Sequence, residues 1–225
     1  MFTGIIQSAG EVRKVEHRSN DLRLHIALGD LDDTIRTGDS IAVNGLCLTA
    51  IARPSPLLVV DVSRESLDRS CIGDWNAGTA VNLEKALTLS TPLGGHLVSG
   101  HVDGIGVLES IEKVARSQKL IFSVAATLGK YIAEKGSITV DGISLTVNEV
   151  VDRKSGTQGP RCLFAVNIVP HTLSNTTMTL YQTGRKVHIE VDLLARYLER
   201  LMSTVGEKNK SSIDLELLKR SGFLA

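Results

Sequence analysis

The chain has 225 residues, in which 25 Lys and Arg balance 25 Asp and Glu, and 42% of the residues are hydrophobic. This composition excludes wholesale disorder, and the balanced charge argues against a nucleic-acid partner, which would need a basic surplus. No stretch approaches the ~18 apolar residues of a membrane helix, and the N-terminus lacks a basic segment followed by an apolar run. We therefore expect a cytoplasmic protein with no membrane partner, built as one large domain or two small ones.

Three sequence blocks occur twice, in the same order. The matched blocks are residues 2–5 with 98–101, residues 43–49 (VNGLCLT) with 140–146 (VDGISLT), and residues 78–84 with 184–190. The offset between the copies is 96 in the first block, 97 in the second and 106 in the third. The growth from 97 to 106 indicates an insertion in the second copy at residues 153–161, where the composition is that of a loop. The sequence therefore predicts two homologous units of about 95 residues, joined near Pro92 to Gly95.

Within each unit the apolar periodicity is that of strands. In the first unit, Ile41 and Val43 lead to the tight-turn dipeptide Asn44-Gly45, after which apolar residues alternate with polar ones. The second unit repeats this pattern around Asp141-Gly142. Short strands with Gly-rich turns predict a small closed or nearly closed β-barrel in each unit, with residues 128–133 as a candidate helix in the second.

After Asp192 the spacing becomes helical. Apolar side chains recur at Leu194, Tyr197, Leu198 and Leu201, with charged residues between them. This stripe packs either back on the barrels or, as we favour, against the same helix of neighbouring chains. We expect the residues from 205 on to form a mobile tail.

The residue types argue against a metal centre. Cys47, Cys71 and Cys162 are odd in number and widely spaced, which fits reduced thiols better than a disulfide framework or a zinc site. His96 and His101 are five positions apart, so they fall on opposite faces of a strand. The glycines around these histidines suggest instead a close approach of backbone to a neighbouring strand or a planar ligand.

The polar faces of the repeated strands are the candidates for binding. Cys47 and Thr49 occupy the same places as Ser144 and Thr146. Their side chains either bond to backbone within the sheet or line a pocket for a polar heterocycle. Lys135 and the equivalent pair Ser66 and Thr172 would add polar contacts, although turn-stabilising or surface roles are common for such residues.

The motifs MFTGI, VNGLCLT, VDGISLT and GGHLVSGHVDG, in this order over about residues 1–202, resemble the riboflavin synthase family. The resemblance implies an all-β fold of two tandem six-stranded Greek-key barrels with a C-terminal helix. It divides the chain into lumazine-binding barrels over residues 1–94 and 95–191, a trimerisation helix over residues 192–204 and a flexible tail over residues 205–225.

The resemblance also implies an activity. Members of the family convert two molecules of 6,7-dimethyl-8-ribityllumazine into riboflavin and 5-amino-6-ribitylamino-pyrimidinedione by transferring a four-carbon unit, without metal or redox cofactor. They act as homotrimers, with the active site between the N-terminal barrel of one subunit and the C-terminal barrel of the next, and some dock onto a lumazine synthase shell.

Carried over to this chain, the resemblance implies two pockets. The first is expected to comprise Gly4, Ile5, Ile6, Cys47, Leu48, Thr49, Asp61, Val62, Ser63, Arg64, Glu65 and Ser66. The second is expected to comprise Gly100, His101, Val102, Lys135, Ser144, Leu145, Thr146, Val169, Pro170, His171, Thr172, Leu173 and Ser174. Within them we expect His101 to transfer protons, because imidazole titrates near neutral pH. The other expected catalytic residues orient the heterocycle, relay protons or, for Phe2, position the N-terminal segment: Ser40, Cys47, Ser144, Thr146 and Phe2.

A second class of function shares this fold. Lumazine-binding antenna proteins hold one chromophore without converting it, and such relatives tend to lose the pocket motif in one repeat. Because VNGLCLT and VDGISLT are both intact, the sequence favours the enzyme.

Overall fold

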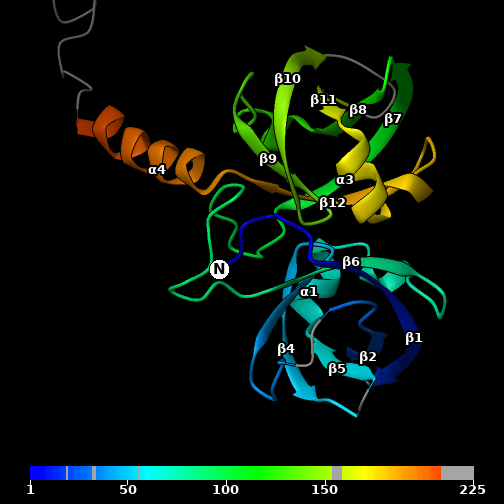
Figure 1. Ribbon diagram of the computed structural model, residues 1–225. Helices are drawn as coiled ribbons and strands as arrows, with labels where there is room; N and C mark the ends of the chain where they lie inside the picture. The colour runs from blue at the N-terminus through cyan, green and yellow to red at the C-terminus, as the bar shows by residue number, and fades with distance from the viewer. Residues whose placement is uncertain (19, 32–33, 55, 154–158, 209–225) are drawn as a thin grey trace, which may run out of the picture. The chain divides into compact units, whose positions relative to one another are not determined.

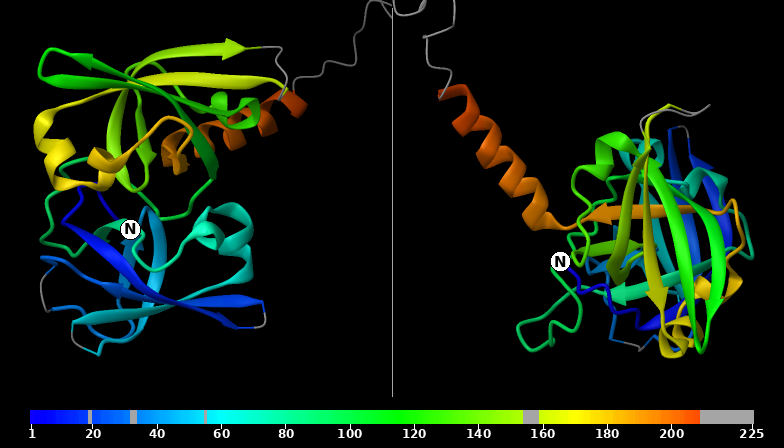
Figure 2. Two further views of the ribbon diagram at one scale, coloured as in Figure 1. Left: turned by 90° about the vertical axis from the view of Figure 1, so that its right-hand side faces the viewer. Right: turned by 90° about the horizontal axis from the view of Figure 1, so that it is seen from above.

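The computed structural model describes residues 1–18, 20–31, 34–54, 56–153 and 159–208 (Figure 1). It contains two closed six-stranded antiparallel barrels, with strand orders β1-β2-β5-β4-β3-β6 and β10-β11-β8-β7-β12-β9. The two orders are equivalent, because each strand of the second barrel has a counterpart six positions earlier in the numbering. The predicted pair of Greek-key barrels is thus confirmed, and Figure 2 shows each as a separate closed sheet.

The first barrel and its helical segments have the following bounds: β1 Ser8–Arg18, β2 Asp21–Ala27, β3 Ser40–Val43, β4 Leu46–Ala52, β5 Leu57–Val62, α1 Arg64–Arg69, η1 Ile72–Asp74 and β6 Ala80–Lys85. Those of the second are β7 Gly104–Val114, β8 Ser117–Ala125, α2 Ala126–Gly129, β9 Ser137–Val140, β10 Ile143–Arg153, β11 Arg161–Ile168, α3 Pro170–Asn175, η2 Thr177–Leu180 and β12 Lys186–Val191. The predicted insertion lies between β10 and β11, and residues 154–158 within it lie outside the described part of the chain.

The predicted hairpin turns are present in both barrels. Asn44 and Gly45 have φ values of 45° and 80°, and Asp141 and Gly142 have 45° and 81°. Two successive positive φ angles define the turn whose twist matches that of the flanking strands. The turns set a register in which Ile41 pairs with Leu48 and Ile138 pairs with Leu145.

The two hairpin turns touch each other. A Cβ atom placed on Gly45 would lie 2.7 Å from the backbone nitrogen of Gly142, and one on Gly142 would lie 2.7 Å from that of Gly45. Glycine is therefore required at both positions for the positive φ and also for the close approach of two backbones.

The helix predicted over residues 128–133 is shorter in the structure than predicted, and it begins two residues earlier. The structure forms α2 over Ala126–Gly129 and continues as turns, with Tyr131 N–H donating to the Leu128 carbonyl. Gly129 ends the helix where the backbone passes against Cys162, whose side chain would collide with any Cβ at this position.

The C-terminal helix belongs to a second structural unit that begins at Leu193. This helix, α4, spans Leu193–Lys208 and extends beyond residue 204, where the predicted helix ends. The helix continues through Gly206. A single glycine weakens a helix by only about 1 kcal/mol, which is too little to end it here. The predicted tail from residue 209 on lies outside the described residues, and none of the described helices has the length and apolar character of a membrane span.

Candidate functional site

Two short arms pair with each other between the barrels. Phe2 N–H donates to the Val98 carbonyl at 2.7 Å, and Val98 N–H donates to the Phe2 carbonyl at 3.1 Å. Both side chains are fully buried, in a small cluster with Ala42. These residues are equivalent in the repeat, so the arms, defined as residues 2–6 and 98–102, meet symmetrically. Phe2 thus lies buried where the two arms pair.

Each arm lies on the hairpin of the other repeat. The Gly4 carbonyl accepts a hydrogen bond from Ser144 N–H, and the Gly100 carbonyl accepts one from Cys47 N–H, both at 2.8 Å. Gly4 and Gly100 have φ values of 74° and 82°, and a Cβ on either would lie 2.6 Å from the Cβ of its hairpin neighbour. Two independent steric reasons therefore require glycine in each arm.

The crossing of the arms corrects the expected grouping of residues. Val102 packs in the core cluster of the first barrel, and Ile6 packs against that of the second. Gly4, Ile5 and Ile6, expected in the first pocket, therefore belong beside Ser144. Likewise the segment from Gly100 to Val102, expected in the second pocket, belongs beside Cys47. The repeat pattern could not reveal this exchange, because both groupings preserve it.

The polar residues of both hairpins lie on the outer face of the barrels. Cross-strand pairs share a face, and the outward pairs are Ser40 with Thr49, Ala42 with Cys47, Ser137 with Thr146, and Thr139 with Ser144. Leu48 is buried in the first barrel's core and Leu145 packs against the second, so these two predicted contact residues point inward, as does Val62. Their contribution to a pocket is limited to backbone.

The first candidate pocket combines Cys47 and Thr49 with the arm residue His101, whose side chain is exposed. The register of β4 and β5, set by Ala50 opposite Val60, places Asp61 opposite Thr49. Asp61 accepts two hydrogen bonds from Arg23, at 2.7 and 2.9 Å, and the guanidinium lowers the pKa of that carboxyl.

The α1 segment expected in this pocket is mostly occupied with its own helix. Ser63 is the N-cap residue, and its hydroxyl accepts from Ser66 N–H at 3.3 Å. Arg64 and Glu65 form ion pairs along the helix, with Asp68 and Arg69 respectively. Ser63 and Ser66 thus stabilise the start of α1. The ion pairs of Arg64 and Glu65 are made within the helix.

The second candidate pocket combines Ser144 and Thr146 with Ile5 and with a residue that the sequence analysis did not select. His96 Nδ1 lies 2.7 Å from Ser144 Oγ, and its Nε2 lies 3.3 Å from Thr139 Oγ1. Burial lowers the pKa of His96, partly offset by the Asp192 carboxylate. A neutral imidazole held by two hydroxyls can exchange protons with either.

The structure places the remaining residues expected in the second pocket in a turn and at or on α3. Lys135 is exposed in a left-handed turn with φ 65°, and its N–H donates to the Val147 carbonyl. Val169 is the N-cap residue of α3, and Pro170 begins the helix. The other members of that segment lie on α3: His171, Thr172, Leu173 and Ser174.

The sequence contains a signal for one further candidate residue, Asn167, but none for His96. The offset of 106 maps Asp61 onto Asn167, which the register places opposite Thr146, whereas the predicted segment began at Val169. His96 precedes the first matched block of the second repeat, residues 98–101, so the repeat pattern did not point to it. The sequence draws attention to His96 only through its spacing from His101, which does not fit a metal site.

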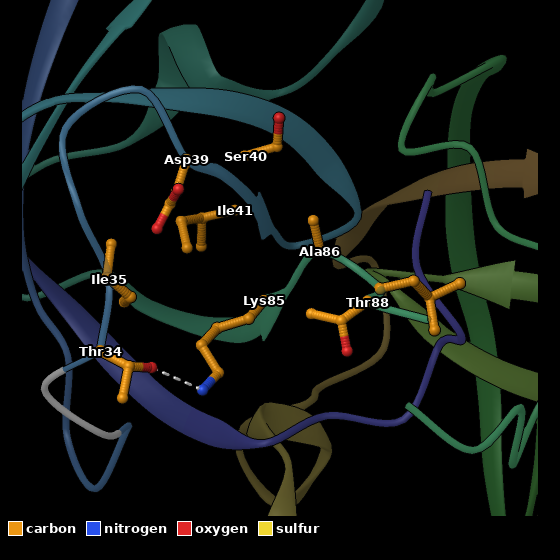
Figure 3. Close-up of a pocket in the computed structure, with 9 residues that line it drawn as sticks. Thr34, Ile35, Asp39, Ser40, Ile41, Lys85, Ala86 and Thr88 are labelled. Atoms are coloured by element: carbon orange, nitrogen blue, oxygen red, sulfur yellow. Dashed lines mark hydrogen bonds between the residues drawn. The ribbon is translucent and has the colours of Figure 1, made fainter. Parts of the chain in front are cut away.

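A cavity of about 310 Å³ opens beside Ser40 (Figure 3). It is lined by Thr34, Ile35, Asp39, Ser40, Ile41, Lys85, Ala86, Leu87 and Thr88. Lys85 Nζ donates to Thr34 Oγ1 at 3.1 Å, and in Figure 3 the Ser40 side chain points away from this amine. Ser40 therefore belongs both to the cavity wall and to the outer hairpin face that carries Cys47 and Thr49.

Two buried carboxylates lie beside the arms. Glu84 and Glu190 are 3% and 4% exposed, and burial raises the pKa of both despite the hydrogen bonds that they accept. Because the folded pKa lies above the unfolded value of 4.5, the folded protein holds protons that the unfolded chain has released. The free energy of unfolding should therefore fall as pH rises from 4.5 through the folded pKa values.

We expect this fall to be smaller in Glu84→Gln and Glu190→Gln, because glutamine does not titrate. Urea unfolding at several pH values from 4.5 upward measures the slope. Glu112→Gln, a change of an exposed residue on β7, is the matched control and should keep the wild-type slope. An unchanged slope in both buried variants would contradict the assignment of the titration to these two groups.

Comparison with known proteins agrees with the doubled barrel. The family model of the lumazine binding domain matches residues 3–86 and 99–192, one match for each barrel. The chain is 41% identical to riboflavin synthase of Photobacterium phosphoreum over 226 aligned residues, covering 100% of both chains. It is 40% identical to riboflavin synthase of Mycobacterium tuberculosis strain H37Rv, over 92% of this chain and 100% of the relative, and 34% identical to that of Bacillus subtilis strain 168, over 99% and 100%.

Solved structures share the fold. The crystal structure of LumP complexed with riboflavin superimposes with a TM-score of 0.74 and 22% identity, covering 85% of this chain and 99% of LumP. The paired barrels and their matched outer faces therefore define a tandem lumazine-binding-domain protein. Its full-length similarity is to enzymes, and the chain belongs to the riboflavin synthase family as an enzyme of this type.

Proposed function

We propose that the enzyme converts two molecules of 6,7-dimethyl-8-ribityllumazine into riboflavin and 5-amino-6-ribitylamino-pyrimidinedione. One molecule donates a four-carbon unit and the other accepts it. The atoms balance between the two substrates and the two products, so the reaction needs no external oxidant or reductant. The observation that carries the proposal is the equivalence of the two pockets, because a reaction that consumes two copies of one molecule requires two related binding sites.

In this proposal the two pockets have different proton-transfer groups. The donor must lose a proton from its C7 methyl group, and the acceptor must be attacked at C7. His101 lies beside Cys47 in the first pocket, whereas Ile5 takes the equivalent place in the second, where His96 bonds to Ser144. Holding both heterocycles in a reactive geometry accounts for ~7–11 kcal/mol of barrier reduction, and proton transfer adds about 10²–10⁴-fold.

The direct test is optical. Wild-type enzyme incubated with the lumazine alone should develop the longer-wavelength absorption of riboflavin, with one riboflavin formed for every two lumazines consumed. A stable bound chromophore without conversion would overturn the proposal in favour of an antenna protein, the function that shares this fold. The full-length identity to synthases, compared with 22% to LumP, favours the enzyme.

We further propose that the enzyme acts in the cytoplasm as a homotrimer, in which the first pocket of one subunit faces the second pocket of the next, and that a lumazine synthase shell is a possible partner. The helical spacing of Leu194, Tyr197, Leu198 and Leu201 supports an oligomer, because these side chains are all more than half exposed in the single chain. Sedimentation of the purified enzyme, alone and with a lumazine synthase, tests both assemblies.

Blocking one pocket tests whether two are needed. Thr49→Tyr and Thr146→Tyr place a large side chain on an exposed strand position, where tyrosine is compatible with the sheet. Each variant should bind one ligand in place of two and lose on the order of 10²-fold or more in turnover, because one reactant is no longer held. The controls Thr49→Val and Thr146→Val remove only a hydroxyl and should lose about tenfold or less.

Mixing the two blocked variants tests whether the two pockets that face each other belong to neighbouring subunits or to the same chain. If pockets of neighbouring subunits face each other, subunits refolded together from Thr49→Tyr and Thr146→Tyr enzyme should regain activity, since some pairs then combine two open pockets. Activity that stays absent in verified mixed oligomers would contradict the proposed pairing between subunits.

A further inference from the structure

Glu84 and Glu190 occupy equivalent places on β6 and β12, next to the outer faces of the hairpins. Glu84 pairs in register with Ala42 on β3, and Glu190 pairs with Thr139 on β9. Neither carboxylate is among the groups proposed to act on substrate. Both are buried, and a buried carboxylate is costly unless its oxygens are hydrogen-bonded, so the partners of each are informative.

Glu190 holds the second arm with three hydrogen bonds. One oxygen accepts from Ser99 N–H at 2.6 Å and from Ser99 Oγ at 2.8 Å, and the other accepts from Gly100 N–H at 3.0 Å. Ser99 Oγ in turn accepts from His101 N–H at 3.2 Å. One side chain therefore fixes the backbone of all three residues that lead to the exposed imidazole.

Glu84 makes the same contacts with the first arm. Its oxygens accept from Thr3 N–H at 2.7 Å, from Thr3 Oγ1 at 2.6 Å and from Gly4 N–H at 3.0 Å. Thr3 Oγ1 accepts from Ile5 N–H at 3.1 Å. Each clamp is defined as the glutamate with its Thr or Ser, its Gly and the residue that follows. The two clamps have the same hydrogen-bond pattern, and the residue that follows the glycine is Ile5 in one and His101 in the other.

Each clamp acts on the pocket of the opposite barrel. Glu190 lies on the second barrel, but the arm that it fixes bonds through Gly100 to Cys47 of the first. Glu84 lies on the first barrel, and its arm bonds through Gly4 to Ser144 of the second. The connection is a continuous series of hydrogen bonds of 3.0 Å or less from carboxylate to arm to hairpin.

We propose that Glu190 is a positioning residue for the first pocket and Glu84 a positioning residue for the second, so that each barrel orders the ligand site of the other. This inference rests on the proposed function for the identity of the ligand. A carboxylate is needed because each clamp presents three donors, and two oxygens can accept them all. Glutamine would offer one oxygen and turn an N–H₂ donor toward a backbone N–H or hydroxyl, which releases part of the arm.

The test measures binding in the first pocket. Riboflavin bound in the first pocket should protect Cys47 from iodoacetamide, and peptide mass spectrometry distinguishes Cys47 from Cys71 and Cys162. In Glu190→Gln the riboflavin concentration needed for half protection should rise on the order of tenfold or more, because charge-assisted bonds to the arm are lost. In Glu84→Gln, which has equal burial and equal chemistry, it should stay at the wild-type value while the affinity of the second site falls.

Milder variants keep the test decisive if either glutamine variant fails to fold. Ser99→Ala removes two hydrogen bonds from the Glu190 clamp, the one that Ser99 Oγ donates to Glu190 and the one that it accepts from His101 N–H. Thr3→Ala removes the two equivalent bonds from the Glu84 clamp. Only Ser99→Ala should weaken protection of Cys47. Equal shifts in both variants, or none in either, would overturn the proposal. Because protection reports binding and not turnover, an enzyme that protects Cys47 but makes no riboflavin would refute the proposed reaction and leave this test valid.

Discussion

Gly45→Ala, which adds a single methyl group, is expected to lower the free energy of unfolding by about 2–6 kcal/mol. Two costs combine. The positive φ of 80° is strained for any residue with a Cβ, and this Cβ would lie 2.7 Å from a backbone nitrogen of the facing turn. Because the obstacle is backbone, no side-chain rotation relieves it, and the two hairpin turns must move apart. Urea unfolding measures the loss.

Gly78→Ala is the control that separates these costs. Gly78 has a φ of 92°, but nothing lies within 4 Å of its Cβ position. It should therefore show only the conformational penalty, about 1–2 kcal/mol. Equal losses in the two variants would mean that the contact between the turns contributes nothing to stability.

Replacing His188 with leucine should cost a comparable amount, about 2–6 kcal/mol. His188 is 1% exposed and joins the two repeats, with Nδ1 2.9 Å from the Asn44 carbonyl and Nε2 3.1 Å from Cys71 N–H. A carbonyl partner requires Nδ1–H, and an N–H partner requires an unprotonated Nε2, so the contacts fix a neutral tautomer. Leucine would leave both backbone groups without this partner, at about 1–3 kcal/mol each.

The first repeat provides the matched control for this prediction. Asn82 occupies the equivalent place, and its amide donates to the Asp141 carbonyl at 2.9 Å and accepts from Thr177 N–H at 2.8 Å. His188→Asn should therefore retain both kinds of contact and cost about 1 kcal/mol, mainly through the lost stacking on Trp75. A variant as unstable as His188→Leu would show that the histidine ring, and not the hydrogen bonds, stabilises this contact.

The barrels were predictable from the sequence because their signals are local. Alternation along residues 40–49 and the dipeptides Asn44-Gly45 and Asp141-Gly142 specify hairpins without reference to the rest of the chain. The internal repeat then predicts a second copy of whatever the first one forms. The outward face of Cys47 and Thr49 followed from the same period of two.

The assignment of arms to pockets could not be predicted in this way. The bonds of Gly4 to Ser144 and of Gly100 to Cys47 join residues far apart in the sequence, and no local pattern distinguishes them from bonds within one repeat. In the sequence, Glu84 and Glu190 are ordinary polar residues near the ends of strands. Only the structure shows that both are buried and that each accepts three hydrogen bonds. His96 lies outside the matched blocks, so the internal repeat carries no information about it.

The exchanged arms also set an order of events during synthesis. Val102 belongs to the first barrel's core cluster, so that core is incomplete until translation has passed this residue. The second barrel's core in turn packs against Ile6, which precedes that whole barrel in the sequence and is synthesised before it. The halves of this enzyme thus complete each other, and a nascent chain halted between them would expose an open core to proteases and chaperones.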